Sequence, residues 1–476
     1  MTRPSASVRV QAQFEAPVHT PALVIGAGAC GMTAALALAA RGVECVVVER
    51  DARPSGSTAL SSGFIPAAGT AVQRGLGIDD SAADFARDIQ AKAHGSAAPH
   101  LVEAYTGAIA PALDFLQQRH GLQWEVLDGF LYPGHTRRRM HSLKERTGSA
   151  LAESLEAACQ VQGIPILTHA QAQTLVVNEA GSVLGVEVQR PDGSIEAIAC
   201  DALLLACNGY GASPELLQRF VPEVASAEFA GHPGNDGTAL RWGEALGAPL
   251  ADMQAYQGHG SWAQPHGVLI TWALMMEGGV QINTQGQRFH DETQGYSEAA
   301  LHVLAQPGRV AWNVFDERIL ELARSFPDFA AAEAAGALKT AADVTALARI
   351  IGCDAAALEA TLASAGQGAA HQAPDAFARH FKRALAAPYY AIKVTGALFH
   401  TQGGLDIDGH CRVLRAAGNP TDTQNVLPNL WAAGGAARGV SGNHVSGYLS
   451  GNGLLSAVAG GYIAAGSMAD QLGTPS

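Results

Sequence analysis

The sequence is poor in positive charge and in paired cysteines. Its 476 residues include 30 Lys and Arg against 43 Asp and Glu, which gives a formal net charge of −13. That balance disfavours binding to the phosphate backbone of nucleic acid or to an anionic membrane surface. The seven cysteines are scattered and form no Cys-x-x-Cys pair, which argues against a zinc site or a disulfide framework and fits a reducing cytoplasm. We therefore expect a cytoplasmic protein with no metal whose partner is a small molecule.

Long apolar runs are also missing. The first twenty residues contain no apolar run of the length that a secretory signal needs. The longest candidate for a membrane span, near residues 22–48, is interrupted by Arg41 and Glu44. At 48% hydrophobic residues, the chain can nevertheless bury a large core. The composition predicts a globular protein of two or more domains with no membrane span.

What the sequence does contain, near its N-terminus, is the pattern PALVIGAGACGMTAALALAARGVECVVVER. An apolar run is followed by Gly26, Gly28 and Gly31, an alanine-rich segment and a second apolar run that ends at Glu49. The first glycine allows a tight turn, the second lets the backbone approach a pyrophosphate, and the third permits close packing of helix on strand. Glu49 is placed to accept hydrogen bonds from a ribose. The spacing predicts a dinucleotide site at this turn.

The segment that begins at Glu49, ERDARPSGSTALSSGFIPAAGT, resembles the flavoprotein family of fumarate reductases and 3-ketosteroid delta-1-dehydrogenases. In that family an Arg/Gly/Ser/Thr loop passes over the isoalloxazine and pyrophosphate of FAD. Members with covalent flavin carry a histidine just before the threonine of this loop, whereas here Ser57 precedes Thr58. The resemblance therefore implies FAD that is bound non-covalently.

Further stretches extend the resemblance over most of the chain. DALLLACNGYG (201–211), GNDGTAL (234–240) and FHTQGGLDID (399–408) are similar to family segments that contact FAD or form its neighbouring hairpin. Residues 429–465 resemble the last strand, the flavin-contacting loop and the closing helix, although the family often has Glu where Gly435 stands. The cofactor-binding residues that these matches imply are Gly26, Gly28, Ala29, Gly31, Glu49, Arg50, Ser57, Thr58, Ser62, Gly63, Asn208, Gly209, Asp236, Gly434, Ser450, Asn452 and Leu454.

The order of these stretches predicts an α/β fold, with a Rossmann-like FAD-binding domain and an inserted α+β domain that caps the substrate. We expect residues 1–245 and 388–476 to form the FAD-binding domain and residues 246–387 to form the capping domain. Within the insertion, GGVQIN (278–283) has the pattern of a strand. Later alanine-rich segments have helical spacing that is broken at Gly352.

The predicted substrate pocket lacks the arginines of the fumarate reductase branch. Residues 271–301 align without gaps to that branch's T-E-A-V-R-G…R pattern. Trp272, Met275 and Tyr296 stand where the pattern has a glutamate and two arginines, and its last substrate arginine falls at Tyr448. A dicarboxylate needs guanidinium partners, and a buried charge left without its partner costs about 3–5 kcal/mol. The pocket therefore suits an uncharged or singly charged carbonyl compound.

The ketosteroid dehydrogenase branch implies catalytic roles for the tyrosines. There, a tyrosine near the C-terminus and a backbone N–H three or four residues later hold the ketone oxygen, and the matching groups are Tyr448 and the amide of Gly451 or Asn452. A second tyrosine removes the α proton, which points to Tyr296, and a third assists it, which points to Tyr132 in DGFLYPGH. A phenol, whose pKa is about 10, serves as a base only if that pKa is lowered or its proton is relayed onward.

Each of these assignments has a plainer alternative. Tyr448 can pack against one face of a turn, and Tyr132 can hold an extended loop before a proline. His400 matches the family's substrate-binding histidine, although HTQGG also suits a turn with flavin contacts. A single substrate carboxylate can be held by Arg438 or by the run Arg137 to Arg139, for which a solvated loop is the favoured interpretation. The predicted substrate-binding residues are His400, Trp272, Met275 and Arg438.

Together these features predict a FAD-dependent dehydrogenase that introduces an α,β double bond into a cyclic ketone, either a small ring or a ketosteroid. The first alternative is the reverse chemistry, reduction of an unsaturated acid or enone as in fumarate reductases. The second is a non-catalytic flavin-binding electron-transfer subunit. The sequence has neither a haem Cys-x-x-Cys-His nor an iron–sulfur cysteine spacing. We therefore expect an external electron acceptor, which is oxygen, a quinone or a carrier protein.

Overall fold

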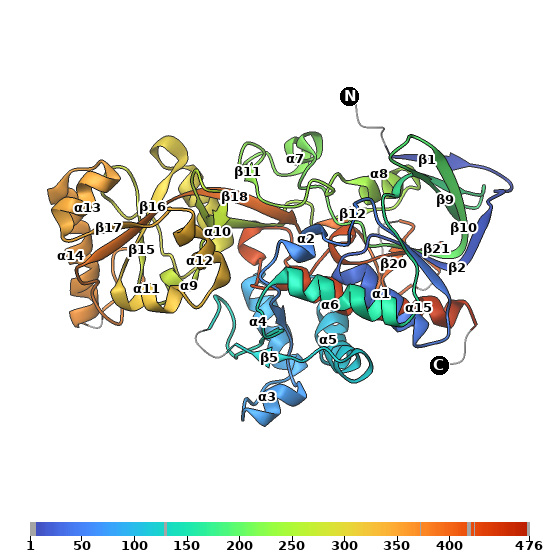
Figure 1. The fold of residues 1–476 in the computed structure, drawn as a ribbon, viewed down its shortest axis with the longest axis horizontal. Helices are drawn as coiled ribbons and strands as arrows, with labels where there is room; N and C mark the ends of the chain where they lie inside the picture. The colour runs from blue at the N-terminus through green and yellow to red at the C-terminus, as the bar shows by residue number, and fades with distance from the viewer. Residues whose placement is uncertain (1–5, 128–130, 372, 417–419, 423, 474–476) are drawn as a thin grey trace.

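The computed structural model describes residues 6–127, 131–371, 373–416, 420–422 and 424–473 of the chain. Two β-sheets organise the molecule, one with nine strands and one with seven. Figure 1 shows helices α9 to α14 gathered at one end of the molecule and the larger sheet toward the other end, with β18 running between them. Across the described ranges, no helix combines the length and apolar character that a membrane crossing requires.

The larger sheet has the strand order β1-β8-β9-β10-β2-β3-β7, with β21 paired to β10 and β20 paired to β21. Strands β3, β2, β10 and β21 are parallel to their neighbours in this set, as in nucleotide-binding α/β proteins. The bounds of the strands are β1 Ser7–Val10, β2 Val18–Ile25, β3 Cys45–Val48, β7 Ile166–Leu167, β8 Gln171–Val177, β9 Val183–Gln189, β10 Ile195–Leu205, β20 Arg412–Leu414 and β21 Val426–Ala432.

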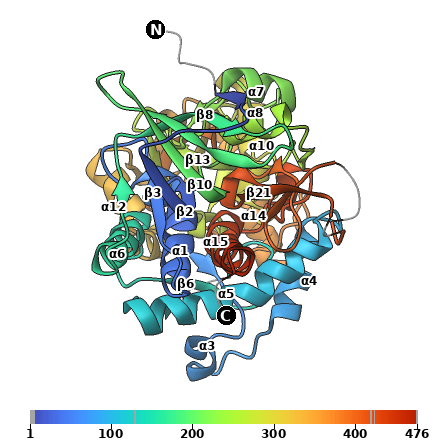
Figure 2. The same cartoon turned by 90° about the vertical axis from the view of Figure 1, so that its right-hand side faces the viewer.

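Helices α1 (Ala29–Ala39) and α15 (Asn452–Gln471) lie side by side beneath the strands of this sheet, as Figure 2 shows. They meet across a glycine, because a Cβ at Gly461 would lie 2.3 Å from the Cys30 carbonyl oxygen. The other helices of this half are α2 Gly56–Ala59, α3 Ala71–Gly75, α4 Ala82–Lys92, α5 Pro99–His120, α6 Gly148–Val161, α7 Pro214–Phe220 and α8 Thr238–Ala245.

The smaller sheet has the order β14-β13-β18-β16-β15, with β11 and β17 also paired to β18. Its strands are β11 Glu228–Phe229, β13 Tyr256–Ala263, β14 Val268–Leu269, β15 Val280–Ile282, β16 Ala311–Asp316, β17 Lys339–Ala341 and β18 Tyr389–Thr401. Its helices are α9 Ala273–Met276, α10 Tyr296–Leu304, α11 Glu317–Ala323, α12 Pro327–Ala334, α13 Val344–Ile351 and α14 Ala355–His371. Short strands β4 Ile65–Pro66, β5 Glu125–Val126 and β6 Met140–Ser142 pair together, and β12 Leu250–Ala251 pairs with β19 Gly404–Leu405.

The predicted fold class is confirmed. The two apolar runs around the glycine pattern form β2 and β3, and GGVQIN contains β15. Gly352 ends α13 with a φ of +82°, so the helices break where the sequence predicts. The domain boundaries at residues 245/246 and 387/388 stay a prediction.

Candidate active site

The turn between β2 and α1 forms a cradle of glycines at the wall of a large cavity. Gly26 has a φ of +108°, and a Cβ there would lie 2.5 Å from the Ala206 carbonyl oxygen. A Cβ at Gly31 would lie 1.9 Å from the Gly26 carbonyl oxygen, so α1 approaches the turn closely only because this residue lacks a side chain. The N-cap residue Gly28 has no side chain to cap α1, and the Thr58 hydroxyl accepts from the Ala29 N–H at 2.9 Å. The remaining N–H groups at this N-terminus suit an anionic pyrophosphate.

Glu49 comes directly after β3, at the wall of the same cavity. Its Oε2 accepts a hydrogen bond from the Ala27 N–H at 2.9 Å, and its Oε1 accepts one from the Asp51 N–H at 2.9 Å. Burial raises the pKa of the Glu49 carboxyl, while these two N–H groups oppose the rise. The carboxylate is thus fixed in place with lone pairs left for a ribose, as a dinucleotide requires.

Most of the other predicted cofactor residues surround this cavity. Arg50 pairs with Asp236 at 3.1 Å, and the Asn208 side-chain amide donates to the Ser57 hydroxyl at 2.7 Å. A side chain at Gly435 would lie 2.2 Å from the Asn208 amide oxygen, so Asn208 fills the space where the family often has glutamate. The predicted cofactor residues that line the cavity are Gly26, Gly28, Ala29, Glu49, Arg50, Ser57, Thr58, Ser62, Asn208, Asp236, Gly434, Ser450 and Leu454.

Four predicted cofactor residues lie behind the cavity wall. They are Gly31, Gly63, Gly209 and Asn452. A Cβ at Gly63 would lie 2.6 Å from the Thr147 carbonyl oxygen, and one at Gly209 would lie 2.2 Å from the Thr401 hydroxyl. The Asn452 amide donates to the Ser441 hydroxyl at 3.0 Å. These residues shape the wall and do not face the cavity.

Aromatic and imidazole rings line another part of the same cavity. Tyr296 begins α10 and Tyr448 lies just before α15, and their ring centroids are 6.0 Å apart. His259 stacks on Tyr296 at 4.8 Å, and His400 meets the Tyr448 ring edge-on at 5.8 Å. The predicted residues Tyr132, Tyr296, Tyr448, Gly451, Trp272 and His400 all line this cavity.

The two facing tyrosines share their hydrogen-bonding environment. Burial raises the pKa of the Tyr296 phenol to about 12, while hydrogen bonds with the hydroxyls of Ser450 and Tyr448 oppose the rise. Burial also raises the pKa of Tyr448, and the backbone N–H groups of Gly453 and Gly451 act against that rise. A negative charge on the Tyr296 oxygen would therefore meet two hydroxyl donors, and the Tyr448 oxygen lies beside backbone donors at the start of α15.

Tyr132 completes the group of three tyrosines. Its ring lies 6.1 Å from that of Phe64, and burial raises its pKa, with the nearby Tyr296 as the next cause. Asp328, which the sequence analysis missed, lines the cavity close enough to add to this rise. Its Oδ2 accepts from the Ser62 hydroxyl at 3.1 Å, and burial raises its own pKa. The carboxylate lies on a short helix, α12, where no sequence pattern marks it.

Two histidines in this part of the cavity are neutral near pH 7. Burial lowers the pKa of His400 to about 4 and that of His259 to about 3. The Ser261 N–H donates to Nδ1 of His259 at 3.1 Å, which places the ring proton on Nε2. The sequence analysis missed His259, because GHGSW matches no catalytic pattern and only its place on β13 brings it to Tyr296.

Two predicted substrate residues, Met275 and Arg438, are not among those that line the cavity. Met275 is fully buried in the hydrophobic core that packs against the smaller sheet. Arg438 pairs with Asp252 at 2.8 Å and with Asp406 at 2.9 Å, so its guanidinium is already satisfied elsewhere. These partners lie far from Arg438 in sequence, and no local pattern indicates them.

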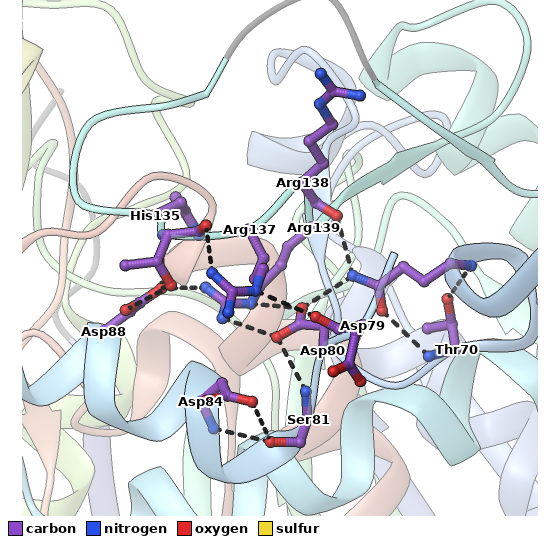
Figure 3. Close-up of polar contacts among 12 residues, drawn as sticks. Thr70, Asp79, Asp80, Ser81, Asp84, Asp88, His135, Arg137, Arg138 and Arg139 are labelled. Carbon is purple, nitrogen blue, oxygen red and sulfur yellow. Dashed lines mark hydrogen bonds and ion pairs between the residues drawn. The ribbon is translucent and has the colours of Figure 1, made fainter. Parts of the chain in front are cut away.

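The three arginines at residues 137–139 differ in their exposure. Arg137 and Arg138 are exposed, as a solvated loop requires. Arg139 is buried between Asp80 and Asp88, which Figure 3 shows, so the solvated interpretation is wrong for this residue. Two carboxylates surround its guanidinium, which leaves it unsuited to bind an anionic substrate.

Guanidinium groups are scarce around the cavity. Of the residues that the structure describes, only Arg50 brings a guanidinium to the cavity wall. Arg50 is the residue next to Glu49, and its guanidinium is paired with Asp236. Beside the tyrosines, the charged side chain in the wall is Asp328, a carboxylate. This part of the cavity can polarise a carbonyl and move a proton, but it offers no arginine partner to a second carboxylate.

The parallel strands at the centre of the larger sheet, the glycine cradle and the fixed carboxylate of Glu49 define a dinucleotide-binding protein, and the second sheet's half contributes to the same cavity. The family described as FAD binding domain matches residues 22–454, and the chain belongs to that family. Within it, the chain is one of the fumarate reductase and 3-ketosteroid dehydrogenase flavoproteins, as the sequence predicts. It is a FAD-dependent oxidoreductase that acts on CH–CH groups.

Three comparisons show the range of its relatives. A probable fumarate reductase of Shewanella frigidimarina is 27% identical over 456 residues, which cover 94% of this chain and 74% of the relative. A 4-oxocyclohexanecarboxylate 2-dehydrogenase of Sinomonas cyclohexanicum is 24% identical over 539 residues, covering 92% of this chain and 93% of that protein. The crystal structure of a 3-ketosteroid-delta4-(5alpha)-dehydrogenase from Rhodococcus jostii superposes with a TM-score of 0.78 at 23% identity, covering 98% and 99% of the two chains.

Proposed function

We propose that the protein dehydrogenates a cyclic ketone at its α,β carbons. The observation that carries this proposal is the buried pair of Tyr296 and Tyr448, in a part of the cavity wall where the structure describes no arginine. A ketone needs one polarised oxygen and one base for its α proton. A dicarboxylate needs paired guanidinium groups, which these positions do not supply.

The chain's own groups suit the proton-transfer half of this reaction. Tyr448 and the Gly451 N–H donate to the ketone oxygen, which makes the α proton more acidic and stabilises the enolate. Tyr296 takes the α proton in its phenolate form, which keeps the hydrogen bond from the Ser450 hydroxyl while the Tyr448 hydroxyl turns to the ketone oxygen. The electrons of the α C–H bond form the new double bond as the β hydrogen leaves with its electron pair. Bound FAD supplies the two-electron oxidant, and an external acceptor then removes the electrons.

Non-covalent attachment of FAD is part of the proposal. Ser57 stands where covalent members have histidine, and its hydroxyl accepts hydrogen bonds from the side-chain amides of Asn208 and Asn235. These amides donate to the hydroxyl and do not act as a base, so they do not activate Ser57 as a nucleophile. The wall instead supports FAD through the glycine cradle and the carboxylate of Glu49.

Charge restricts the proposed substrate to neutral ketones or to ketones whose charged group avoids Asp328. The carboxylate of Asp328 lines the cavity near Tyr132 and would repel an anionic substituent placed there. Trp272 and Phe326 add apolar surface to the wall. A ring with one carbonyl matches this mixture of apolar surface and two adjacent phenols better than a small diacid does.

The reverse reaction is the second candidate, and the relatives favour it, because several are named as fumarate reductases. In that direction Tyr448 would polarise the carbonyl of an enone or unsaturated acid, and Tyr296 would donate a proton to the α carbon. A non-catalytic electron-transfer role, the third candidate, would not require a buried pair of phenols in the cavity.

Removing single hydroxyls tests the proposal. The Tyr296→Phe and Tyr448→Phe variants should each lower kcat for ketone desaturation by at least about a hundredfold, the usual scale for losing a general base or an oxyanion donor. The matched control is Tyr390→Phe, whose hydroxyl lies outside the cavity beside Glu317 and should leave kcat unchanged. Near-normal rates in both cavity variants, with FAD content equal to that of the wild type, would refute the mechanism.

A further inference from the structure

A turn next to the tyrosines carries a histidine that has no role in the reaction described so far. His135 is 7% exposed, and its backbone N–H donates to the Tyr132 carbonyl oxygen at 3.1 Å. Its Nε2 lies 2.9 Å from the carbonyl oxygen of Ser450. Because a carbonyl oxygen only accepts, Nε2 must carry the proton. The ring's Nδ1 is buried, and none of the described residues makes a hydrogen bond to it.

The Ser450 carbonyl belongs to the peptide that also carries the Gly451 N–H. In a planar trans peptide the C=O and N–H point in opposite directions. His135 holds the C=O on one side, so the Gly451 N–H points to the other side, where the Tyr448 hydroxyl lies. The orientation of this one peptide therefore decides whether the substrate oxygen meets a donor or an acceptor.

Glycine makes this peptide easy to turn. Gly451 has a φ of +86° and is the N-cap of α15, and a Cβ there would lie 2.5 Å from Cδ of Pro66. The site thus requires glycine, whose backbone accepts more than one orientation of the preceding peptide. A flipped peptide would present the Ser450 carbonyl oxygen to the ketone oxygen and repel it. A donor that holds the carbonyl from behind removes that possibility.

A buried cluster of Asp80, Asp88 and Arg139 holds the turn that carries the His135 imidazole. The backbone N–H and the hydroxyl of Thr136 donate to Asp88, each at 2.8 Å. Arg139 joins Asp88 to Asp80, with hydrogen bonds to Asp80 of 2.8 and 2.9 Å (Figure 3). The Phe85 ring lies under the Arg139 guanidinium at 5.0 Å and 6.1 Å from the His135 ring. Asp88 thus holds the backbone of the turn, and Phe85 packs near the His135 ring.

We propose that His135 is a positioning residue: it donates to the Ser450 carbonyl and thereby aims the Gly451 N–H at the substrate oxygen. Burial lowers the pKa of His135 to about 4, which keeps the ring neutral and Nδ1 without a proton near pH 7. The proposal rests on the proposed function in one respect, because the oxygen it serves is that of a ketone or its enolate. The orientation of the peptide can be tested without turnover.

Binding of phenols to the oxidised, FAD-loaded enzyme provides that test. A phenolate imitates an enolate oxygen, and 4-nitrophenol and 4-methylphenol can be titrated by the change in flavin absorbance. In His135→Met, which removes the donor and keeps bulk, 4-nitrophenolate should bind far more weakly, while 4-methylphenol, which is neutral near pH 7, should lose little affinity. The kcat should fall by about a hundredfold with little change in KM, the scale of a catalytic group misplaced by about 1 Å. His135→Gln, whose amide can reach Ser450, should restore most of both losses.

His135→Asn is the companion variant, since its shorter amide falls near the position of Nδ1 and cannot reach the Ser450 carbonyl. It should behave like His135→Met, which keeps the test decisive if the methionine variant folds poorly. Unchanged 4-nitrophenolate affinity and kcat in a folded His135→Met or His135→Asn enzyme would overturn the proposal. Tight phenolate binding by a wild-type enzyme that desaturates no ketone would instead refute the proposed function and leave this inference standing.

Discussion

At the scale of single residues, the pKa of Tyr296 is high for a residue that acts as a base. Burial raises the pKa of its phenol to about 12, so only a small fraction is phenolate near pH 7. The hydroxyls of Ser450 and Tyr448 oppose that rise but do not cancel it. The rate of α-proton removal should therefore follow the small phenolate fraction of the free enzyme.

The raised pKa of Tyr296 predicts a pH dependence of kcat/KM, and its form depends on the direction of the reaction. For ketone desaturation, kcat/KM should rise about tenfold per pH unit from pH 6 to pH 10, because a base with a pKa near 12 must lose its proton to work. For reduction of an enone, the same group acts as an acid and is protonated throughout, so kcat/KM should be flat with respect to Tyr296. Tyr296→Phe should lose the slope. A plateau in the desaturation profile near pH 7 would contradict the assignment.

The sequence could reveal a site residue only where that residue belongs to a local sequence pattern. Gly26, Glu49 and Tyr448 lie within local sequence patterns, and all three line the cavity. Arg438 and His259 depend on partners from other elements, namely Asp252 for the first and Tyr296 for the second. An ion pair over 186 positions leaves no trace in a local pattern. The charge of a residue is visible in the sequence, but its partner is not.

At the scale of elements, the site is built from the starts of two helices. Tyr296 is the first residue of α10, and Tyr448 precedes the start of α15 by four positions. Helix N-termini leave backbone N–H groups free, which suits an oxygen that becomes negative during the reaction. Trp272, beside α9, donates its indole N–H to the Glu292 carbonyl oxygen at 3.0 Å and so joins the cavity wall to a buried charge network.

That network should contribute strongly to stability. Glu292 is buried and accepts from Arg379 at 2.7 Å and from Arg288 at 2.6 Å. Glu292→Gln should lower the free energy of unfolding by about 3–5 kcal/mol, because it leaves buried guanidinium charge without its partner. Glu333→Gln, which breaks an exposed pair with Arg324, is the matched control and should cost about 1 kcal/mol or less. Urea unfolding followed by circular dichroism measures both.

The effect of Glu292 should also depend on pH with a definite sign. Burial alone would raise the pKa of this carboxyl, but Arg379 and Arg288 hold it at about 2, below the ordinary value of 4.5. The stabilisation is therefore complete above about pH 5 and is lost as the pH falls from 4.5 toward 2. The difference between wild type and Glu292→Gln should shrink over that window. A difference that stays constant down to pH 2 would contradict the role of this charge.

Elements with strong local patterns were predictable, and those held by distant pairing were not. The strands around the glycine pattern and the break at Gly352 follow from residue types at fixed spacing. The sequence does not show that β18 pairs with four other strands, since they lie at residues 228–229, 256–263, 311–316 and 339–341. Pairing between such distant segments is decided by the packing of the whole sheet.

At the scale of the whole molecule, one cavity is lined by residues of both halves. Gly28 and Glu49 come from the larger sheet's half, and Tyr296 and Trp272 come from the smaller sheet's half. A cofactor bound along this wall would contact the glycine cradle, and the tyrosines line another part of the same cavity. A fumarate reductase and a ketosteroid dehydrogenase of known structure share this overall fold.

FAD should therefore stabilise the fold as a whole. At a free FAD concentration of 100 times its Kd, the expected gain is about 2.7 kcal/mol, measured as a rise in Tm on adding FAD to the stripped protein. Gly28→Val should abolish the gain, because even a Cβ at this position lies 3.3 Å from the Thr58 hydroxyl and at the wall of the cofactor cavity. Gly107→Ala is the control, because outside its own helix no described atom lies within 4 Å of the new Cβ. Equal FAD-induced shifts in Tm for the two variants would contradict the placement of the cofactor.

The most direct test of the central claim is stopped-flow reaction of the two redox states under anaerobic conditions. Oxidised enzyme should lose its flavin absorbance on mixing with a cyclic ketone such as cyclohexanone or a 3-ketosteroid. Reduced enzyme should be reoxidised by the corresponding enone at least about a hundredfold faster than by fumarate, the scale expected when a transition state lacks its cationic donor. Rapid reoxidation by fumarate, with no bleaching by any ketone, would show that the protein is a dicarboxylate reductase and would contradict the account.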